Sequence, residues 1–329
     1  MGGNALRNTN TRRYELDEYL RIASLVTVKL SSLQNVCRSC VIPHVRDKQT
    51  FGDLDVLYST WSEANVRTDV IQRMFEPNEI VKNGEVISFN VEELQVDIIN
   101  SSHSSLNYAL NYFSWNDAGN LIGKLFHRFG MKHGHRGLVL PLRDGDNKFA
   151  DVPLTLNHND ALKFVGLDPA VFNRGFDNLD QLFKYVASSP YYNPEFYKLE
   201  NLNTIAKVRD RKRETYKKFL AFGEAYSGPA YTEFNRDKSV YLERIFDAFP
   251  HAYAKFEEAN ARLATQKFLR QKFNGDIVKE ITGLTGKQLG AFMKHLREQF
   301  DFGDAVLLYL PEATIRKNVV DQHQTFVHN

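Results

Sequence analysis

Cysteine is scarce in this sequence, and neither a long apolar run nor a large net charge is present. The 329 residues include two cysteines, Cys37 and Cys40, and carry a formal net charge of +2. Two thiols supply only half of a tetrahedral zinc site and no second Cys pair follows, so we expect two small residues in a half-buried strand of a reduced protein. Because the net charge is small, any nucleic-acid surface must be a local patch.

The lack of apolar runs also argues against a membrane location. No stretch approaches the roughly 18 consecutive apolar residues that a membrane span needs, and the polar, basic N-terminus lacks the apolar region of a secretory signal. Composition is ordinary, with 43% apolar and 25% charged residues. We therefore expect a soluble protein located in the cytoplasm, which would be the host cytoplasm for a viral protein.

Local patterns predict an α+β fold with two domains. Asn83-Gly84 lies between two β-rich segments and predicts a two-residue hairpin turn. The other elements expected before it are a helix that follows an N-cap at Thr11 and ends at Ser31-Ser32, a strand over residues 36–45 and an antiparallel strand that begins near residue 53. From Asn159 onward the pattern is helical, so we place a domain boundary between residues 1–158 and 159–329.

Aspartates are embedded in two apolar segments of the N-terminal part. Asp53 and Asp55 alternate with apolar residues, so both carboxylates project from one face of the predicted strand. Aspartate is disfavoured in strands, and two carboxylates on one face repel each other unless a cation lies between them. Asp97 lies in a second apolar segment, residues 94–99. Three carboxylates on neighbouring strands outline a two-metal phosphoryl-transfer site, in which Mg²⁺ or Mn²⁺ has oxygen ligands.

These residues resemble the polymerase-β-type nucleotidyltransferase superfamily, whose pattern is a glycine-rich turn, Asp-x-Asp and a third Asp on a following strand. Residues 52–56, Gly-Asp-Leu-Asp-Val, and Asp97 match the acidic part. Residues 1–6, Met-Gly-Gly-Asn-Ala-Leu, are similar to the Gly-Gly-x-Ala-Leu turn of some members, including the abortive-infection and toxin-type branch. About fifty residues separate that turn from Asp53, which is longer than the family's usual spacing. The chain also resembles bacteriophage nucleotidyltransferases.

The resemblance implies roles for the three acids within a palm-like catalytic domain over residues 1–158. Asp53 and Asp55 would hold the Mg²⁺ bound to the β- and γ-phosphates of a nucleoside triphosphate, and all three acids would share a second Mg²⁺. Asp97 would be the nearest group to a general base.

The resemblance also implies contacts to the nucleotide from a phosphate-binding turn and from a helix after the third acid. Residues 116–128 have an apolar face and an opposite polar stripe at helical spacing. The alternative interpretation is a solvated helix face. The residues that the resemblance places at the nucleotide are Gly2, Gly3, Asn4, Gly52, Asn120, Lys124 and His127.

A basic cluster occupies residues 207–218, where seven of twelve residues are Lys or Arg and two are acidic. Such a cluster neutralises phosphates and gives sequence-independent, salt-sensitive affinity for nucleic acid, and a tyrosine within it is suited to stack on a base. The alternative is a solvated helix face with intrahelical ion pairs. The candidate nucleic-acid-binding residues are Arg209, Arg211, Lys212, Arg213, Tyr216 and Lys217.

Residues 283–290, Gly-Leu-Thr-Gly-Lys-Gln-Leu-Gly, resemble a turn and helix near the end of bacterial-type CCA-adding enzymes and poly(A) polymerases. With the basic cluster, this favours an RNA 3′ end, preferably of tRNA, as the acceptor of a pyrophosphate-releasing nucleotidyltransferase that binds ATP or another nucleoside triphosphate. The helical domain, residues 159–329, would then bind the acceptor. The alternatives are a toxin- or defence-type enzyme that modifies tRNA or a protein, a metal-dependent nuclease, and a non-catalytic nucleic-acid-binding protein.

Overall fold

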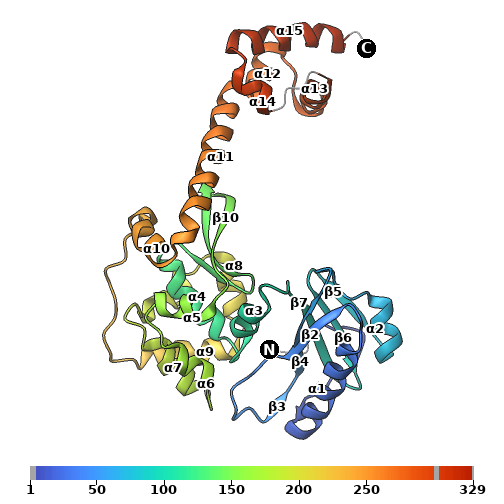
Figure 1. Cartoon of the computed structure of the whole chain (residues 1–329), viewed down its shortest axis with the longest axis vertical. Coiled ribbons are helices and arrows are strands. Elements are labelled where there is room, and N and C mark those ends of the chain that lie inside the picture. The colour runs from blue at the N-terminus through green and yellow to red at the C-terminus, as the bar shows by residue number, and fades with distance from the viewer. Residues whose placement is uncertain (1–4, 300–303, 328–329) are drawn as a thin grey trace. The chain divides into compact units, whose positions relative to one another are not determined.

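The computed structural model describes residues 5–299 and 304–327 (Figure 1). It has the predicted α+β fold, with a mixed sheet near the N-terminus and helices in the C-terminal part. The chain packs into two compact units: Met1–Pro141 with Asp151–Tyr253, and Leu142–Ala150 with Ala254–Asn329. The domain boundary predicted between residues 158 and 159, where the helical pattern begins, stays a prediction. Within the described ranges, no helix is long and apolar enough to cross a membrane.

A five-stranded sheet, in the order β2-β4-β7-β6-β5, forms the centre of the N-terminal part. Its strands are β2 (Val36–Val41), β4 (Asp53–Thr60), β5 (Ile80–Asn83), β6 (Val86–Val91) and β7 (Leu94–Asn100). Strands β4 and β7 are parallel, and the other neighbours are antiparallel. The antiparallel pairing predicted for β2 and β4 is therefore confirmed. Strands β1 (Tyr14–Glu15) and β3 (Thr50–Phe51) form a separate two-stranded ladder.

The two faces of this sheet have different partners. Leu54 and Val56 of β4 are fully buried in one hydrophobic cluster with Ile22 and Val26 of α1 (Leu16–Ser31), which packs along the sheet (Figure 1). Each such buried side chain contributes about 1.5–3 kcal/mol to folding. Helix α2 (Thr68–Phe75) joins the same cluster. On the other face, Leu57 packs with α3 (Leu106–Phe113). Because side chains alternate along a strand, this is also the face of the β4 acids.

The predicted hairpin is present, with its turn one residue later than expected. Asn83 pairs with Val86 across β5 and β6, so the two turn residues are Gly84 and Glu85. Gly84 has φ +60°, a conformation that glycine adopts without steric cost. The requirement for positive φ therefore places glycine first in the turn, and the predicted turn at Asn83-Gly84 is wrong by one position.

Further helices and a smaller sheet follow the five-stranded sheet in the chain. Those of the first unit include α4 (Ala118–Arg128), α5 (His158–Phe164), α6 (Pro169–Arg174), α7 (Leu179–Ala187), α8 (Thr204–Asp210), α9 (Glu214–Glu224) and α10 (Leu242–Ala248). A three-stranded sheet is formed by β8 (Lys132–Gly134), β9 (Gly137–Asp144) and β10 (Asn147–Thr155). Short 3₁₀ helices cover Pro194–Phe196, Leu199–Asn201, Lys238–Tyr241 and Pro250–Ala252.

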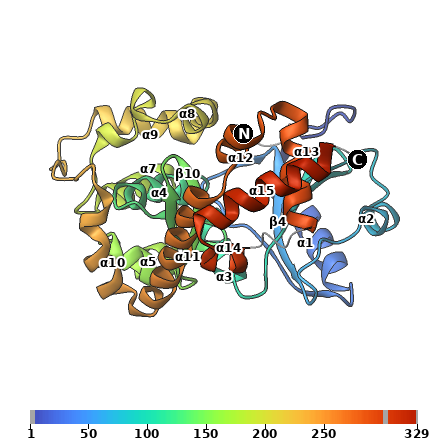
Figure 2. The same ribbon diagram turned by 90° about the horizontal axis from the view of Figure 1, so that it is seen from above.

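The second unit is built mainly from helices with their own hydrophobic core. Its helices are α11 (Tyr253–Lys272), α12 (Gly275–Thr282), α13 (Gly286–Gln299), α14 (Asp304–Tyr309) and α15 (Glu312–Val327). Phe292 and Leu296 of α13 are fully buried with Ile315 and Val319 of α15, and the two helices adjoin in both views (Figures 1 and 2). Of the residues that resemble a turn and helix of CCA-adding enzymes, 283–285 connect α12 to α13 and 286–290 form the beginning of α13.

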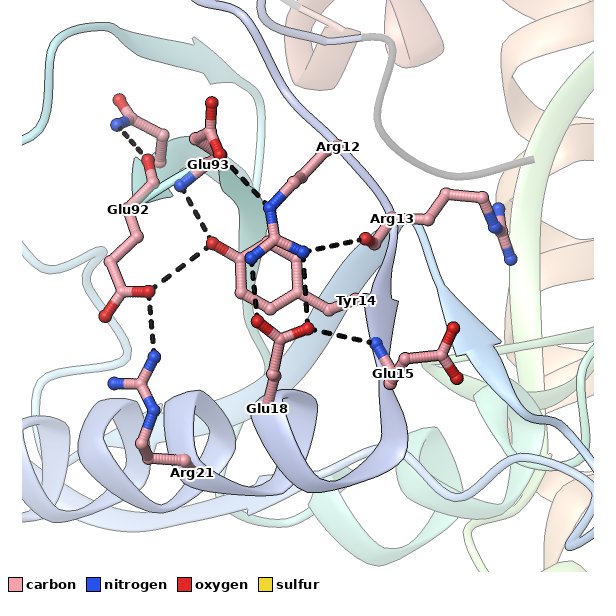
Figure 3. A network of polar contacts seen from close by, with 9 residues as sticks. Arg12, Arg13, Tyr14, Glu15, Glu18, Arg21, Glu92 and Glu93 are labelled. Carbon is pink, nitrogen blue, oxygen red and sulfur yellow. Dashed lines mark hydrogen bonds and ion pairs between the residues drawn. The ribbon is translucent and has the colours of Figure 1, made fainter.

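An extended N-terminal segment, residues 5–15, is held along the turn between β6 and β7 (Figure 3). We call it the N-terminal strap. The Arg12 guanidinium pairs with Glu18 at 2.7 Å and with Glu93 at 3.1 Å. The buried Tyr14 hydroxyl accepts a hydrogen bond from the Glu93 backbone N–H at 3.1 Å. Exposed ion pairs contribute about 0–1 kcal/mol each, so the buried tyrosine and the backbone bonds account for most of this attachment.

Candidate metal and nucleotide site

The three predicted acids converge at the beginning of two adjacent strands. Asp55 of β4 stands opposite Asp97 of β7 in the parallel register, and Asp53 precedes Asp55 by two residues on the same face. One oxygen from each of the three carboxylates lies within 4.8 Å of the other two. Within residues 5–299 and 304–327, this is the one group of three or more His, Cys, Asp or Glu side chains close enough to hold an ion.

The carboxylates disfavour one another's charge. Burial, with the charges of Asp53 and Asp97, raises the pKa of Asp55 to about 8. Burial also raises the pKa of Asp97, against the opposing effect of its hydrogen bonds. Two half-buried acids with raised pKa values are typical of a cation site, because a bound divalent ion replaces the repulsion between the carboxylates by attraction to the ion.

Lys48 is a cation that acts on the acids. Burial lowers the pKa of Lys48, while Asp53 and Asp55 oppose that shift. Its ammonium lies 4.7 Å from the centre of the Phe51 ring, which stacks on Tyr19 with centroids 3.9 Å apart. The site therefore has an aromatic wall beside a partly buried lysine.

Arg46, two residues earlier, is engaged with a different part of the first unit. Its guanidinium donates to Asp177 Oδ1 at 2.6 Å and to the Arg174 carbonyl. These residues line a cavity of about 760 Å³ beside α6 and α7. The loop that carries Lys48 is thus fixed at Arg46 and leads directly into β3 and β4.

Gln95 is a site residue that the sequence interpretation did not include. It lies on β7 two residues before Asp97, on the same face, and is 2% exposed. Its Nε2 donates to both oxygens of Asp97, at 3.0 and 2.9 Å, and the Ser88 side chain also hydrogen-bonds this carboxylate. A glutamine inside an apolar strand, in phase with an aspartate, is the sequence signal that indicates such a role.

The structure describes only one of the predicted nucleotide-binding glycines, Gly52. Gly2, Gly3 and Asn4 lie outside the described residues. Gly52 is half-buried between β3 and β4, directly before Asp53, so its position beside the acids agrees with the sequence prediction, while its contact with a nucleotide stays a prediction.

Asn120 and Lys124 of α4 face a buried carboxylate of α8. Lys124 Nζ donates to Asp210 Oδ2 at 2.9 Å and Asn120 Nδ2 donates to Asp210 Oδ1 at 3.3 Å. Arg209 completes the group through its Nε, 2.6 Å from Asp210 Oδ1. Although burial opposes the charged form, Arg209 and Lys124 hold the pKa of Asp210 below its ordinary value. A role for Asn120 and Lys124 in nucleotide binding stays a prediction, in which a phosphate would compete with Asp210. His127 is exposed on the same helix.

The basic cluster divides into paired and exposed side chains. Arg213 pairs with Asp117, and Lys217 pairs with Glu214 at 2.6 Å. The exposed members that remain as candidates for phosphate contact include Arg211 and Lys212. The predicted surface is therefore narrower than the seven basic residues of the sequence indicate.

The stacking role predicted for Tyr216 is corrected by its burial. The ring is fully buried, and the hydroxyl donates to the Tyr197 carbonyl at 2.6 Å. Tyr216 shares a helical face with Phe219, three residues later, which is also buried. The ring is part of the core and does not present a surface to a base.

The connection between α12 and α13 begins and ends with glycines in left-handed backbone conformations. Gly283 ends α12 with φ +71°, and Gly286 begins α13 with φ +54°. Glycine adopts such conformations without steric cost, so the backbone geometry alone accounts for glycine at these two positions. The acceptor-binding role that the resemblance implies for this turn stays a prediction.

A comparison with solved structures gives a weak match to a polymerase. It is polymerase beta of Leishmania infantum in a ternary P/T complex, with 14% sequence identity and a TM-score of 0.33. The matched part covers 41% of this chain and 62% of the polymerase chain, so the likeness spans less than two thirds of that protein. No family model and no curated protein matches the sequence. The acidic triad therefore carries the functional inference.

Proposed function

We propose that this protein is a metal-dependent nucleotidyltransferase, which moves a nucleoside monophosphate from a nucleoside triphosphate to a hydroxyl acceptor and releases pyrophosphate. The observation that supports this most strongly is the convergence of Asp53, Asp55 and Asp97 within 4.8 Å on one face of the sheet. Carboxylates with raised pKa values lower the free energy of unfolding when no cation neutralises them, so their presence together supports a functional role.

The residues present fit a hard divalent cation. All three donors are carboxylate oxygens, the ligands that Mg²⁺ and Mn²⁺ prefer, and a cation would remove the repulsion that raises the pKa of Asp55. When bound, the ion would supply charge neutralisation at the phosphates and lower the pKa of the acceptor hydroxyl.

The chain's own side chains then have separate tasks. Asp53, Asp55 and Asp97 would all bind the ion through carboxylate oxygens, and Asp97 would also be the nearest group to accept the proton of the acceptor hydroxyl. Gln95 and Ser88 favour the ionised form of Asp97 because both donate hydrogen bonds to it. Lys48 would face the negative charge of the triphosphate from beside the acids.

We further propose an RNA 3′ end, tRNA for preference, as the acceptor. The exposed cations of the basic cluster, among them Arg211 and Lys212, support sequence-independent binding to a phosphate backbone. A toxin- or defence-type enzyme would use the same acids with a different acceptor.

The experiment that tests the proposal is incubation of the protein with total RNA and each α-labelled nucleoside triphosphate in turn, with Mg²⁺ or Mn²⁺. We expect label on RNA from at least one triphosphate, and none with Asp55→Asn. The control is Asp69→Asn, which removes an exposed carboxylate of α2 and should retain full transfer. Label on the protein would support a different acceptor, RNA loss without added triphosphate would indicate a nuclease, and full transfer by Asp55→Asn would refute the assignment.

A further inference from the structure

Gln95 connects the third acid with the N-terminal strap. While its Nε2 donates to both oxygens of Asp97, its Oε1 accepts the backbone N–H of Ala5 at 3.0 Å. The two ends of this amide are chemically different, one a donor and one an acceptor. A carboxylate on one side and an N–H group on the other therefore allow a single orientation of the side chain.

The strap approaches Gln95 as an anchored segment. The backbone N–H groups of Arg7 and Asn8 donate to the Glu79 carboxylate at 3.1 and 2.8 Å. Farther along, the Arg12 N–H donates to the Glu93 carbonyl at 2.9 Å. Contacts with Glu79, just before β5, and with the β6–β7 turn thus fix the strap. Among the described residues, the hydrogen bond from the Ala5 N–H joins the strap to the acid site.

The Asp97 carboxylate has little freedom in this arrangement. Gln95 is buried, and Ser88, which stands opposite Asp97 across β6 and β7, also bonds the same group. A ligand carboxylate that is oriented by its neighbours binds a metal more tightly than a free one, and loss of such a neighbour typically lowers metal affinity 10–100-fold.

We propose that Gln95 is a positioning residue that couples the strap to metal binding at Asp97. With the strap in place, the Ala5 N–H fixes the amide, and the amide fixes the carboxylate that faces Asp55. When the bond to Ala5 is lost, the amide can rotate, and Asp97 loses its alignment. This inference rests on the proposed function, since it assigns Gln95 to the same metal site.

The test is a double-mutant cycle read out by Mn²⁺ binding, measured by electron paramagnetic resonance without nucleotide. Gln95→Met keeps the length of the side chain and removes its hydrogen bonds to Asp97 and to Ala5, while Ala5→Pro keeps the glutamine and removes the backbone N–H that donates to it. The control is Asn100→Leu, which removes a buried amide from the far end of the same strand, where it donates to the Glu63 carbonyl at 3.0 Å.

We expect Gln95→Met to weaken Mn²⁺ binding about tenfold and Ala5→Pro to weaken it less. The double variant should match Gln95→Met, because the Ala5 bond has nothing to fix once the amide is gone. Asn100→Leu should lower the thermal midpoint in EDTA, as Gln95→Met does, yet leave Mn²⁺ affinity unchanged.

The outcomes separate the coupling from the proposed function. Additive effects of the two substitutions, or parental Mn²⁺ affinity in Gln95→Met, would overturn the coupling and leave the nucleotidyltransferase proposal standing. A parent protein that binds no Mn²⁺, or an Asp55→Asn variant that binds it equally well, would overturn both. A parent that binds Mn²⁺ yet labels no acceptor would remove the proposed function, and the cycle would still decide whether Gln95 couples the strap to the metal.

Discussion

Replacing Asp55 by asparagine should make the protein more stable while it abolishes nucleotide transfer. The reason is the raised pKa of Asp55, about 8 in the folded protein against about 3.9 in an unfolded chain. A folded state that binds the proton more tightly loses stability as pH rises from the lower value to the higher one. Asparagine has a similar shape and no charge, so it is free of this penalty.

The magnitude follows from linkage. One pKa unit corresponds to about 1.4 kcal/mol, so the raised pKa of Asp55 lowers the free energy of unfolding of the parent by about 1.5 kcal/mol at pH 5 and by at most about 5 kcal/mol at pH 7.5. The stability advantage of Asp55→Asn should therefore grow across this range and level off above about pH 8.

Urea unfolding in EDTA at several pH values measures this difference. Addition of Mg²⁺ should stabilise the parent and leave Asp55→Asn almost unchanged, because binding to the native state raises its stability. Asp69→Asn, an exposed substitution, should show neither effect. An Asp55→Asn variant that is less stable than the parent at pH 7.5, or whose advantage does not depend on pH, would refute the reasoning.

Three further predictions concern other parts of the molecule. Burial lowers the pKa of His158 to about 4, so folding stability should fall by about 3 kcal/mol as pH drops from 6.5 to 4; His158→Phe should flatten that limb of a thermal-unfolding profile, and an unchanged profile would contradict the prediction. Lys124→Met leaves a fully buried carboxylate with one cation fewer and should cost about 3–5 kcal/mol in urea unfolding, whereas Lys217→Met at an exposed pair should cost less than about 1 kcal/mol; equal losses would refute this difference. The double substitution Arg211→Ala with Lys212→Ala should weaken RNA binding and reduce the slope of log affinity against log salt by about 2; an unchanged slope would exclude both from the phosphate contacts.

The sequence was sufficient for those parts of the site that depend on local periodicity. Alternation along β4 placed Asp53 and Asp55 on one face. That Asp97 lies on a strand beside them was expected from the resemblance to the nucleotidyltransferase superfamily, and the parallel register of β4 and β7 confirms it. The contact of Gln95 with Ala5 could not be predicted in this way, because it joins residues 90 positions apart through a backbone group that has no sequence signature.

The basic cluster shows the opposite limit. Its charges are visible in the sequence, but which of them are neutralised depends on tertiary packing. Asp210 is fully buried because Lys124, from a helix 86 positions earlier, reaches it. Tyr216 faces the core together with Phe219, although the cluster that precedes it is mostly charged. A buried position in such a segment is easily assigned to solvent when its partner, here the Tyr197 carbonyl, is distant in the chain.

The parallel pairing of β4 and β7 has a consequence for when the proposed ion site can form during folding. Parallel neighbours need a crossover, here the segment that forms α2, β5 and β6. A nascent chain that has emerged only as far as β4 has two of the acids and no third, and the third arrives at its place only after that crossover has been completed. The proposed ion site therefore requires β7 in its place between β4 and β6, so a chain in which this strand is not yet paired should not bind the ion with all three acids.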